Sequence, residues 1–306
     1  MIPIKDVTQW IEQAIILYKQ GMPYYKIAQQ LNIGRKTVSR YLRELGFKSN
    51  EKYVRNINVN KLRKFDYSIA DNIFENIDTE EKAYWLGFLY ADGYIDNSKN
   101  VISLSLKESD KSHVEKFRHF CGLDEKKLHT KTKTTNNGIS VNYEFSFSSK
   151  KTVEDLFKCG CFNKKTFKIS FPSYDIISKE LIYHFIRGYI DGDGSITHGG
   201  CGSSAITLEV LGTEKFLTTY NKVLGFENKK LYSFNHTSIK RSIISGPYAI
   251  YVLDKIYNNA HIFLQRKYDK YLELRRLALA SPRTARLLAG KIGKDLVNVD
   301  TEVTTA

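Results

Sequence analysis

The most constraining feature of this sequence is an internal repeat that spans most of the chain. Residues 83–93 (AYWLGFLYADG) are echoed by residues 184–194 (HFIRGYIDGDG), and the offset of 101 residues places an acid before a glycine in each copy. The echo continues downstream, where residues 122–128 (GLDEKKL) correspond to residues 225–231 (GFENKKL). A chain that repeats one order of motifs in this way is expected to fold into two similar halves.

Each half is predicted to be an α+β unit with the element order αββαββα. Apolar residues alternate with polar ones at Ile102, Leu104 and Leu106, and again at Val141, Tyr143, Phe145 and Phe147. Such alternation gives a strand one apolar and one polar face. We therefore expect tandem pseudo-twofold repeats whose antiparallel sheets are covered by helices on one face and free to bind DNA on the other, preceded by a small all-α domain.

The first helix of each half is predicted to be an interface helix. Residues 83–91 carry no charge and are apolar almost all round, so this helix is buried on most sides. Small residues lie four apart in both copies, Gly87 with Ala91 and Gly188 with Gly192, which lets two backbones approach closely. We expect the two helices to pack on each other in parallel about a pseudo-twofold axis.

That packing would bring Asp92 and Asp193 together at the helix carboxyl ends, where Gly93 and Gly194 stop the helices. An acid is misplaced there, at a cost of ~0.3–1 kcal/mol each, and a second carboxylate nearby adds repulsion. Divalent cations would compensate, and Mg²⁺ suits a site with few protein carboxylates, water and DNA phosphates. One Asp-Gly pair is usually a turn. Two copies on apolar, small-residue helices predict a metal site.

Residues 7–46 are predicted to form three short helices in a helix-turn-helix arrangement. Gly21 and Pro23 end the first helix, and residues 32–34 (NIG) separate the second from the third. The third helix turns Val38, Tyr41, Leu42 and Leu45 inward and leaves a basic face outside, which comprises Arg35, Lys36, Thr37, Ser39, Arg40 and Arg43. Such a helix can enter a major groove, although a three-helix bundle with a solvated basic face has the same pattern.

The overall charge favours a polyanionic partner. The 306 residues include 47 Lys and Arg against 33 Asp and Glu, a net charge of +14, and nucleic acid is the first candidate. The four cysteines have no paired C-x-x-C spacing, so neither a zinc ribbon nor a disulfide framework is predicted. Without an apolar run near the ~18 residues of a membrane span, or a secretory leader, the chain is expected in the cytoplasm.

These features predict five parts. Residues 1–47 form the helix-turn-helix domain, 48–73 a basic linker, 74–178 the first repeat, 179–280 the second repeat and 281–306 a C-terminal tail. The linker could follow a phosphate backbone, and a solvated tether is an equal alternative.

The paired motifs resemble those of LAGLIDADG homing endonucleases of the single-chain, two-repeat type, over about residues 74–275. The segment 7–46 resembles the helix-turn-helix of resolvases and phage regulators. In the endonuclease family the motif ends in an acid that binds the catalytic metal, and this resemblance assigns that role to Asp92 and Asp193. Asp191, which has Tyr90 as its counterpart in the first motif, need not be a ligand.

The resemblance also implies one basic residue in each half that polarises or positions the attacking water. Lys165, in residues 161–172 (CFNKKTFKISFP), resembles the first, with Lys164 as a near alternative. Lys267, in residues 263–268 (FLQRKY), resembles the second. A phosphate contact or a solvated lysine is the alternative for each.

Base recognition is expected on the polar faces of the sheets. Lys127, His129, Lys131 and Lys133 alternate with Leu128, Thr130, Thr132 and Thr134, which predicts a β-ribbon with its basic side chains on one face, suited to a major groove. Lys240 and Arg241 lie near the corresponding strands of the second half and are assigned the same role on poorer alternation.

The sequence is interpreted as a monomeric, Mg²⁺-dependent endonuclease that cuts both strands of double-stranded DNA at a long, non-palindromic site, because its two repeats differ. The resemblance implies staggered cuts and a gene carried by a mobile intron or a phage-borne or organellar element. The alternative is a non-cleaving DNA-binding regulator, or an RNA-splicing maturase, on the same fold. Loss of the motif acids would favour that alternative, and both acids are present.

Overall fold

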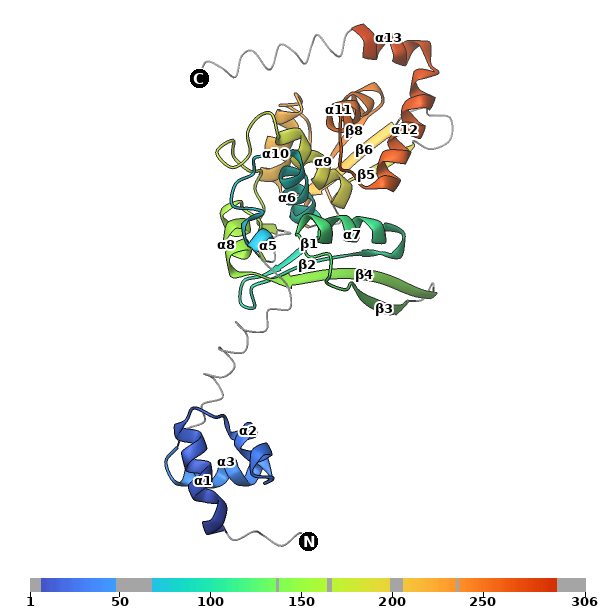
Figure 1. The fold of residues 1–306 in the computed structure, drawn as a ribbon. Coiled ribbons are helices and arrows are strands. Elements are labelled where there is room, and N and C mark those ends of the chain that lie inside the picture. The colour runs from blue at the N-terminus through green and yellow to red at the C-terminus, as the bar shows by residue number, and fades with distance from the viewer. Residues whose placement is uncertain are drawn as a thin grey trace. The chain divides into compact units, whose positions relative to one another are not determined.

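The computed structural model describes residues 7–47, 68–135, 138–163, 167–198, 206–234 and 237–290. The chain divides into two compact units, residues 1–66 and residues 67–306 (Figure 1). No helix in these described ranges is long and apolar enough to cross a membrane.

The first unit contains the three expected helices, α1 (Val7–Lys19), α2 (Tyr24–Gln30) and α3 (Arg35–Glu44). Their core combines Trp10, Ala14, Tyr24, Ile27, Ala28, Val38 and Leu42. One detail differs from the prediction. Leu45 is 53% exposed, because α3 ends at Glu44 and the next residue leaves the core stripe. The left-handed residue of the turn is Asn32 (φ 52°), whereas Gly34 has an ordinary φ of −59°.

The second unit contains the two predicted αββαββα halves. The first half runs through α6 (Glu80–Asp92), β1 (Gly93–Asp96), β2 (Val101–Lys107), a 3₁₀ turn η1 (Glu108–Asp110), α7 (Lys111–Phe120), β3 (His129–Thr135), β4 (Gly138–Ser148) and α8 (Lys150–Lys158). The second half runs through α9 (Ile182–Asp193), β5 (Ser195–His198), β6 (Ile206–Gly212), α10 (Glu214–Val223), β7 (Tyr232–Ser233), β8 (Lys240–Ser245) and α11 (Pro247–Tyr257). Both sheets are antiparallel and share one strand order, β1-β2-β4-β3 and β5-β6-β8-β7. The predicted fold class is confirmed.

The second unit extends beyond the predicted repeat boundaries at both ends. Helix α5 (Ser68–Asn72) lies within the segment predicted as linker, yet it packs on α8, where the Thr152 hydroxyl donates to the Ala70 carbonyl at 2.6 Å. After α11 the chain continues into α12 (Gln265–Leu279) and α13 (Pro282–Gly290), and α13 packs on both α11 and α12. Residues 282–290 of the predicted tail therefore belong to the second unit.

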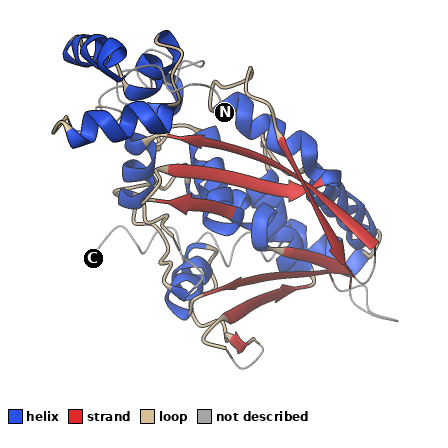
Figure 2. Ribbon diagram, turned by 90° about the horizontal axis from the view of Figure 1, so that it is seen from below, coloured by secondary structure: helices blue, strands red, loops and turns tan. Residues whose placement is uncertain are grey.

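Each sheet has one face under helices and one open face. In the first sheet Ile102, Leu104 and Phe145 are buried on the side where α7 packs against β2 and β4. In the second sheet Leu208 and Ile244, paired across β6 and β8, are buried in the same way. In Figure 2 the long strands run in front of the helices, so the opposite faces of the strands are not covered. The alternating patterns correctly predicted this arrangement.

Helices α6 and α9 form the interface between the halves, and their backbones touch. A Cβ placed on Gly87 would collide with the Phe185 carbonyl oxygen, and a Cβ placed on Gly188 would collide with the Tyr84 carbonyl oxygen. The offset of 101 residues exchanges these two contacts, so the crossing is symmetric. The packing around it is fully buried, from Ala83 to Tyr90 in α6 and from Phe185 to Asp191 in α9.

We predict that Gly188→Ala destabilises the second unit by about 3 kcal/mol or more, because a helix backbone cannot yield to the added methyl as a flexible side chain would. The readout is thermal unfolding followed by circular dichroism. Gly290→Ala is the matched control, since a Cβ there meets nothing within 4 Å. Equal melting temperatures for Gly188→Ala and the parent would contradict the close crossing.

Candidate functional site

Asp92 and Asp193 are the last residues of α6 and α9, and both are exposed. A Cβ on Gly192 would lie 3.6 Å from Asp92 Oδ2, so the first acid lies directly against the second motif. The crossing that joins the helices therefore also brings their acidic ends together. This end of the helix pair leads directly into the sheets, because β1 begins at Gly93 and β5 at Ser195.

The glycines after the acids end the helices for a different reason than expected. Gly93 (φ −69°) and Gly194 (φ −73°) are extended and lie outside the left-handed region that a glycine cap commonly adopts. A Cβ on Gly93 would lie 2.7 Å from the Leu89 carbonyl oxygen, and one on Gly194 would lie 2.6 Å from the Ile190 carbonyl oxygen. Glycine is needed here because the chain turns tightly against the last helical turn.

Lys267 enters this site from α12 and is 6% exposed. Its ammonium group donates to three carbonyl oxygens at the end of α9, those of Ile190 at 2.7 Å, Gly192 at 3.1 Å and Gly194 at 2.6 Å. Burial lowers the pKa of Lys267 to about 8, against the attraction of nearby carboxylates that include Asp92 and Asp193. The lysine thus offsets the negative helix end and holds the main chain around Asp193. Its predicted role in water activation stays a prediction.

Asp191 is a buried structural carboxylate. It is 0% exposed and accepts hydrogen bonds from the Tyr84 hydroxyl at 2.8 Å, the Tyr257 hydroxyl at 2.7 Å and the Leu264 amide at 2.7 Å. Burial raises the pKa of Asp191, and these hydrogen bonds partly offset the effect. Tyr90, its counterpart in the first half, instead donates to the Cys159 carbonyl. The sequence already showed that this position differs between the halves, and the structure shows what each residue contacts.

The protein contributes few acidic groups to the site. Within the part of the chain that the structure describes, no group of three or more His, Cys, Asp or Glu side chains could hold a metal ion. Lys165 and Lys164 lie outside the described residues.

The open face of the first sheet carries most of the predicted strand cations. His129, Lys131 and Lys133 face the same side as Asn142, which pairs with Lys131, and all three are exposed. Lys127 is exposed in the loop before β3. The threonines between them are exposed as well, so both faces of β3 are accessible.

Two residues of this face were missed by the sequence analysis. Lys107 pairs with Asn142 across β2 and β4, and Tyr94 pairs with Ser103 across β1 and β2. Tyr94 is 52% exposed and directly follows the glycine after Asp92. The polar residues that alternate along β2 could have indicated Lys107, whereas Tyr94 appears only through the register of β1.

The second sheet has a less basic open face. Arg241 shares this face with Glu209, and the pair is 3.8 Å apart. Lys240 does not lie on it, because neighbouring residues of a strand point to opposite faces. Its ammonium group donates to the Ser233 hydroxyl at 3.3 Å. The assignment of Lys240 to the open face was therefore wrong.

Helix α3 presents a cationic surface. Arg35, Lys36, Arg40 and Arg43 are exposed, whereas Thr37 and Ser39 are half-buried. The Arg43 guanidinium donates to the Ser39 hydroxyl at 2.6 Å, so this arginine is already held along the helix. The Arg40 guanidinium lies over the Tyr41 ring, 4.9 Å from its centroid.

Residues 5–45 match the family model for the helix-turn-helix domain of resolvase, which confirms the fold predicted for that segment. A curated relative is the replication factor C small subunit of Methanocaldococcus jannaschii, which is 30% identical over 118 residues. The match covers 38% of this chain and 6% of that protein, so the chain spans a small part of that relative's length.

Three solved structures are similar to the chain at low identity. Meganuclease I-SmaMI bound to uncleaveable DNA is 13% identical, with a TM-score of 0.45, over 71% of this chain and 97% of that one. The LAGLIDADG meganuclease I-AabMI bound to uncleaved DNA is 10% identical, with a TM-score of 0.41, over 71% and 96%. The LAGLIDADG homing endonuclease I-LtrWI bound to target DNA is 10% identical, with a TM-score of 0.42, over 73% and 98%.

The hydrogen bonds around Asp191 extend to a buried histidine of the first half. His113 Nε2 lies 2.9 Å from the Tyr84 hydroxyl, which donates its own proton to Asp191, so Nε2 carries the hydrogen. Burial, with smaller contributions from Lys116 and Arg266, lowers the pKa of His113 to about 3. His113 therefore stays neutral in the folded protein between pH 6.5 and about 3. The unfolded chain, in contrast, binds a proton on this histidine below about pH 6.5.

We predict that His113 makes the second unit acid-sensitive. Below pH 6.5 the unfolded state binds a proton that the folded state refuses, so the free energy of unfolding falls by about 1.4 kcal/mol per pH unit as the pH approaches 3. The parent and His113→Gln are to be compared by denaturant unfolding between pH 7 and 5. The variant should lose this slope, and His119→Gln, at an exposed position, should keep it. Parallel profiles for the parent and His113→Gln would contradict the prediction.

Proposed function

We propose that this chain is a metal-dependent, site-specific DNA endonuclease of the LAGLIDADG type, acting as a monomer on a long duplex site that is not a palindrome. The observation that carries the proposal is the pair of exposed carboxylates, Asp92 and Asp193, at the ends of two helices whose backbones touch. Sheets with open polar faces continue from both helices. An acidic centre between two open sheet faces suits hydrolysis of a bound phosphodiester.

The acidic centre brings several negative groups together. Two carboxylates and two negative helix ends converge, and Lys267 supplies one compensating charge from within the protein. The donor set fits Mg²⁺, which accepts a few carboxylate oxygens and completes its shell with water and phosphate oxygens. Bound by Asp92 and Asp193, Mg²⁺ would stabilise the attacking and leaving oxygens of the cleaved phosphodiester.

The remaining residues position the reacting groups. Lys267 fixes the main chain of residues 190–194, and so the orientation of Asp193, through its three hydrogen bonds. Asp191 holds the start of α12 by accepting from the Leu264 amide, which keeps Lys267 in place. In this proposal Lys165 orients water in the first half.

The open faces would recognise the duplex. Cations of the first sheet, among them Lys107 and Lys133, can reach phosphates and base edges in a major groove, whereas Lys131 is paired with Glu144 at 2.7 Å. The second sheet offers Arg241 and Glu209 instead. Because the two surfaces differ, one chain would read two different half-sites, and a symmetric dimer is not needed. The proposed endonuclease would act in the cytoplasm, and its gene would be carried by a mobile genetic element.

We predict that Asp92→Asn and Asp193→Asn each reduce Mg²⁺-dependent cleavage of both strands at least about 100-fold, because one shared acidic centre serves both cuts. DNA affinity in Ca²⁺, measured by gel shift, should change much less, since the groove and phosphate contacts lie elsewhere. Asp175→Asn, at an exposed site, is the matched control.

The two assays separate the possible outcomes. If both variants cut at the parental rate, the shared acidic centre is wrong. If the parent binds a specific site and never cuts it, the chain is a regulator on this fold.

We predict that the first unit contributes to DNA binding through α3. Arg35→Ser combined with Arg40→Ser should lower the magnitude of the slope of log K against log salt by about 1 to 2, because two phosphate contacts are lost. Lys19→Ser combined with Lys26→Ser removes the same charge from exposed positions of α1 and α2 and is the control. An unchanged slope for the α3 variant would remove this unit from the binding surface.

A further inference from the structure

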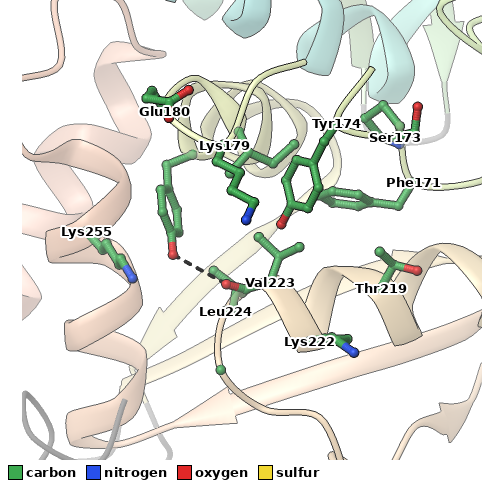
Figure 3. A pocket seen from close by; sticks show the side chains of 14 residues that line it. Phe171, Ser173, Tyr174, Lys179, Glu180, Thr219, Lys222, Val223, Leu224 and Lys255 are labelled. Carbon is green, nitrogen blue, oxygen red and sulfur yellow. Dashed lines mark hydrogen bonds between the residues drawn. The ribbon is translucent and has the colours of Figure 1, made fainter. Parts of the chain in front are cut away.

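The second half contains a cavity of about 620 Å³ that the proposed endonuclease function does not use. It is open to solvent on one side and is lined by the segment before α9, the first turn of α9, the end of α10 and Lys255 of α11. Figure 3 shows Lys179 and Tyr174 extending toward the side formed by Val223 and Leu224. Its volume lies within the range of small-molecule sites, ~300–1,000 Å³.

The cavity is remote from the acidic centre. It contacts Ile182 and Tyr183 at the start of α9, whereas Asp193 is the last residue of that helix. At 1.5 Å per residue the two sites are about 17 Å apart along the helix. A ligand in the cavity would therefore not occupy the cleavage site.

The fold itself does not require this hollow, because the first half closes the corresponding place. Ile77 and Ile177 lie side by side in a parallel bridge, and Phe74 precedes Ile77 by three residues as Tyr174 precedes Ile177. Phe74 is 0% exposed and packs on Phe120, the last residue of α7, at a ring distance of 5.8 Å. In the second half α10 ends in the smaller Val223, and Tyr174 is 48% exposed. The second half thus has a cavity near Tyr174 and Val223, whereas in the first half the rings of Phe74 and Phe120 pack together.

The lining combines aromatic rings with ammonium groups. Lys255 Nζ lies 4.5 Å from the centroid of the Tyr183 ring, and Lys179 Nζ lies 5.5 Å from that of Tyr174. Lys222 adds a third ammonium group from α10. Helix α9 begins here without a side-chain cap, so its positive end adds to the field. Glu180 is the acidic side chain of the lining, and its hydrogen bond with Ser178 lowers its pKa.

We propose that this cavity binds a nucleoside phosphate, with the base against the Tyr174 ring and the phosphate among Lys179, Lys222 and Lys255. The lining has three ammonium groups and one carboxylate, and Glu227, outside the lining, lies 3.1 Å from Lys222 Nζ, so positive charge remains in excess and suits an anionic phosphate. An exposed tyrosine ring stacks on any base, a contact worth ~1–3 kcal/mol. The same chemistry is present in a free nucleotide and in the 5′-phosphorylated end of a single strand.

The test is calorimetric titration of the full chain with AMP, adenosine, inorganic phosphate and a 5′-phosphorylated oligodeoxyadenylate. We expect saturable binding of AMP, and about tenfold weaker binding by Lys222→Glu and by Tyr174→Ser. Lys215→Glu makes the same charge change at an exposed position of the same helix, outside the cavity lining, and should bind AMP within about twofold of the parent. Cleavage of DNA by these variants should be unchanged, so this test and that of the proposed endonuclease fail independently.

The probes also distinguish the source of the ligand. Binding of the oligonucleotide without binding of AMP, with the same loss in both variants, identifies the ligand as a strand end and supports the proposal. If inorganic phosphate binds as tightly as AMP, the proposal is overturned, because the Tyr174 ring would then contribute nothing to binding. Failure of both AMP and the oligonucleotide to bind, or equal binding by Lys222→Glu and Lys215→Glu, also overturns it.

Discussion

The direct backbone contact between α6 and α9 determines the geometry of the rest of the second unit. Gly87 and Gly188 allow each helix to meet a carbonyl oxygen of the other, and no side chain separates them. Because each helix continues into the first strand of its own sheet, this crossing also sets where the two sheets lie. The same contact places Asp92 against the second motif. A wider crossing would separate the acids and move both open faces.

This close crossing concentrates negative charge at the helix ends, and buried polar contacts lie both within the second half and between the halves. Lys267 neutralises the end of α9 through three carbonyl oxygens, while Asp191 accepts a hydrogen bond from Tyr84 of the opposite helix. At the other end of the helix pair the fully buried Arg187 donates to Glu80 of α6 at 2.6 Å. The interface therefore combines apolar packing with a few satisfied charged groups, which restrict its register.

The two halves share a backbone and differ in chemistry. Asp191 and Arg187 have Tyr90 and Leu86 as their counterparts in the first half. The first sheet has a long basic hairpin on its open face, whereas the corresponding hairpin of the second half pairs two residues of β7 with β8. The cavity at the start of α9 is a further difference. A symmetric frame with unlike surfaces suits an asymmetric ligand, such as a duplex whose half-sites differ.

The sequence alone determined the repeat, the order of its elements, the close helix pair and the open sheet faces, because these follow from local periodicity and from small residues at fixed spacing. Contacts between distant segments decided the rest. Lys267 donates to a carbonyl oxygen of α9 that lies more than 70 residues earlier in the chain. The register of β6 with β8 places Lys240 on the face opposite to the open one. Gly93 and Gly194 are needed for close approach and not for a positive φ, which only the packed backbone reveals. Long-range pairing carries no local sequence pattern, and so the tertiary structure alone specified these features.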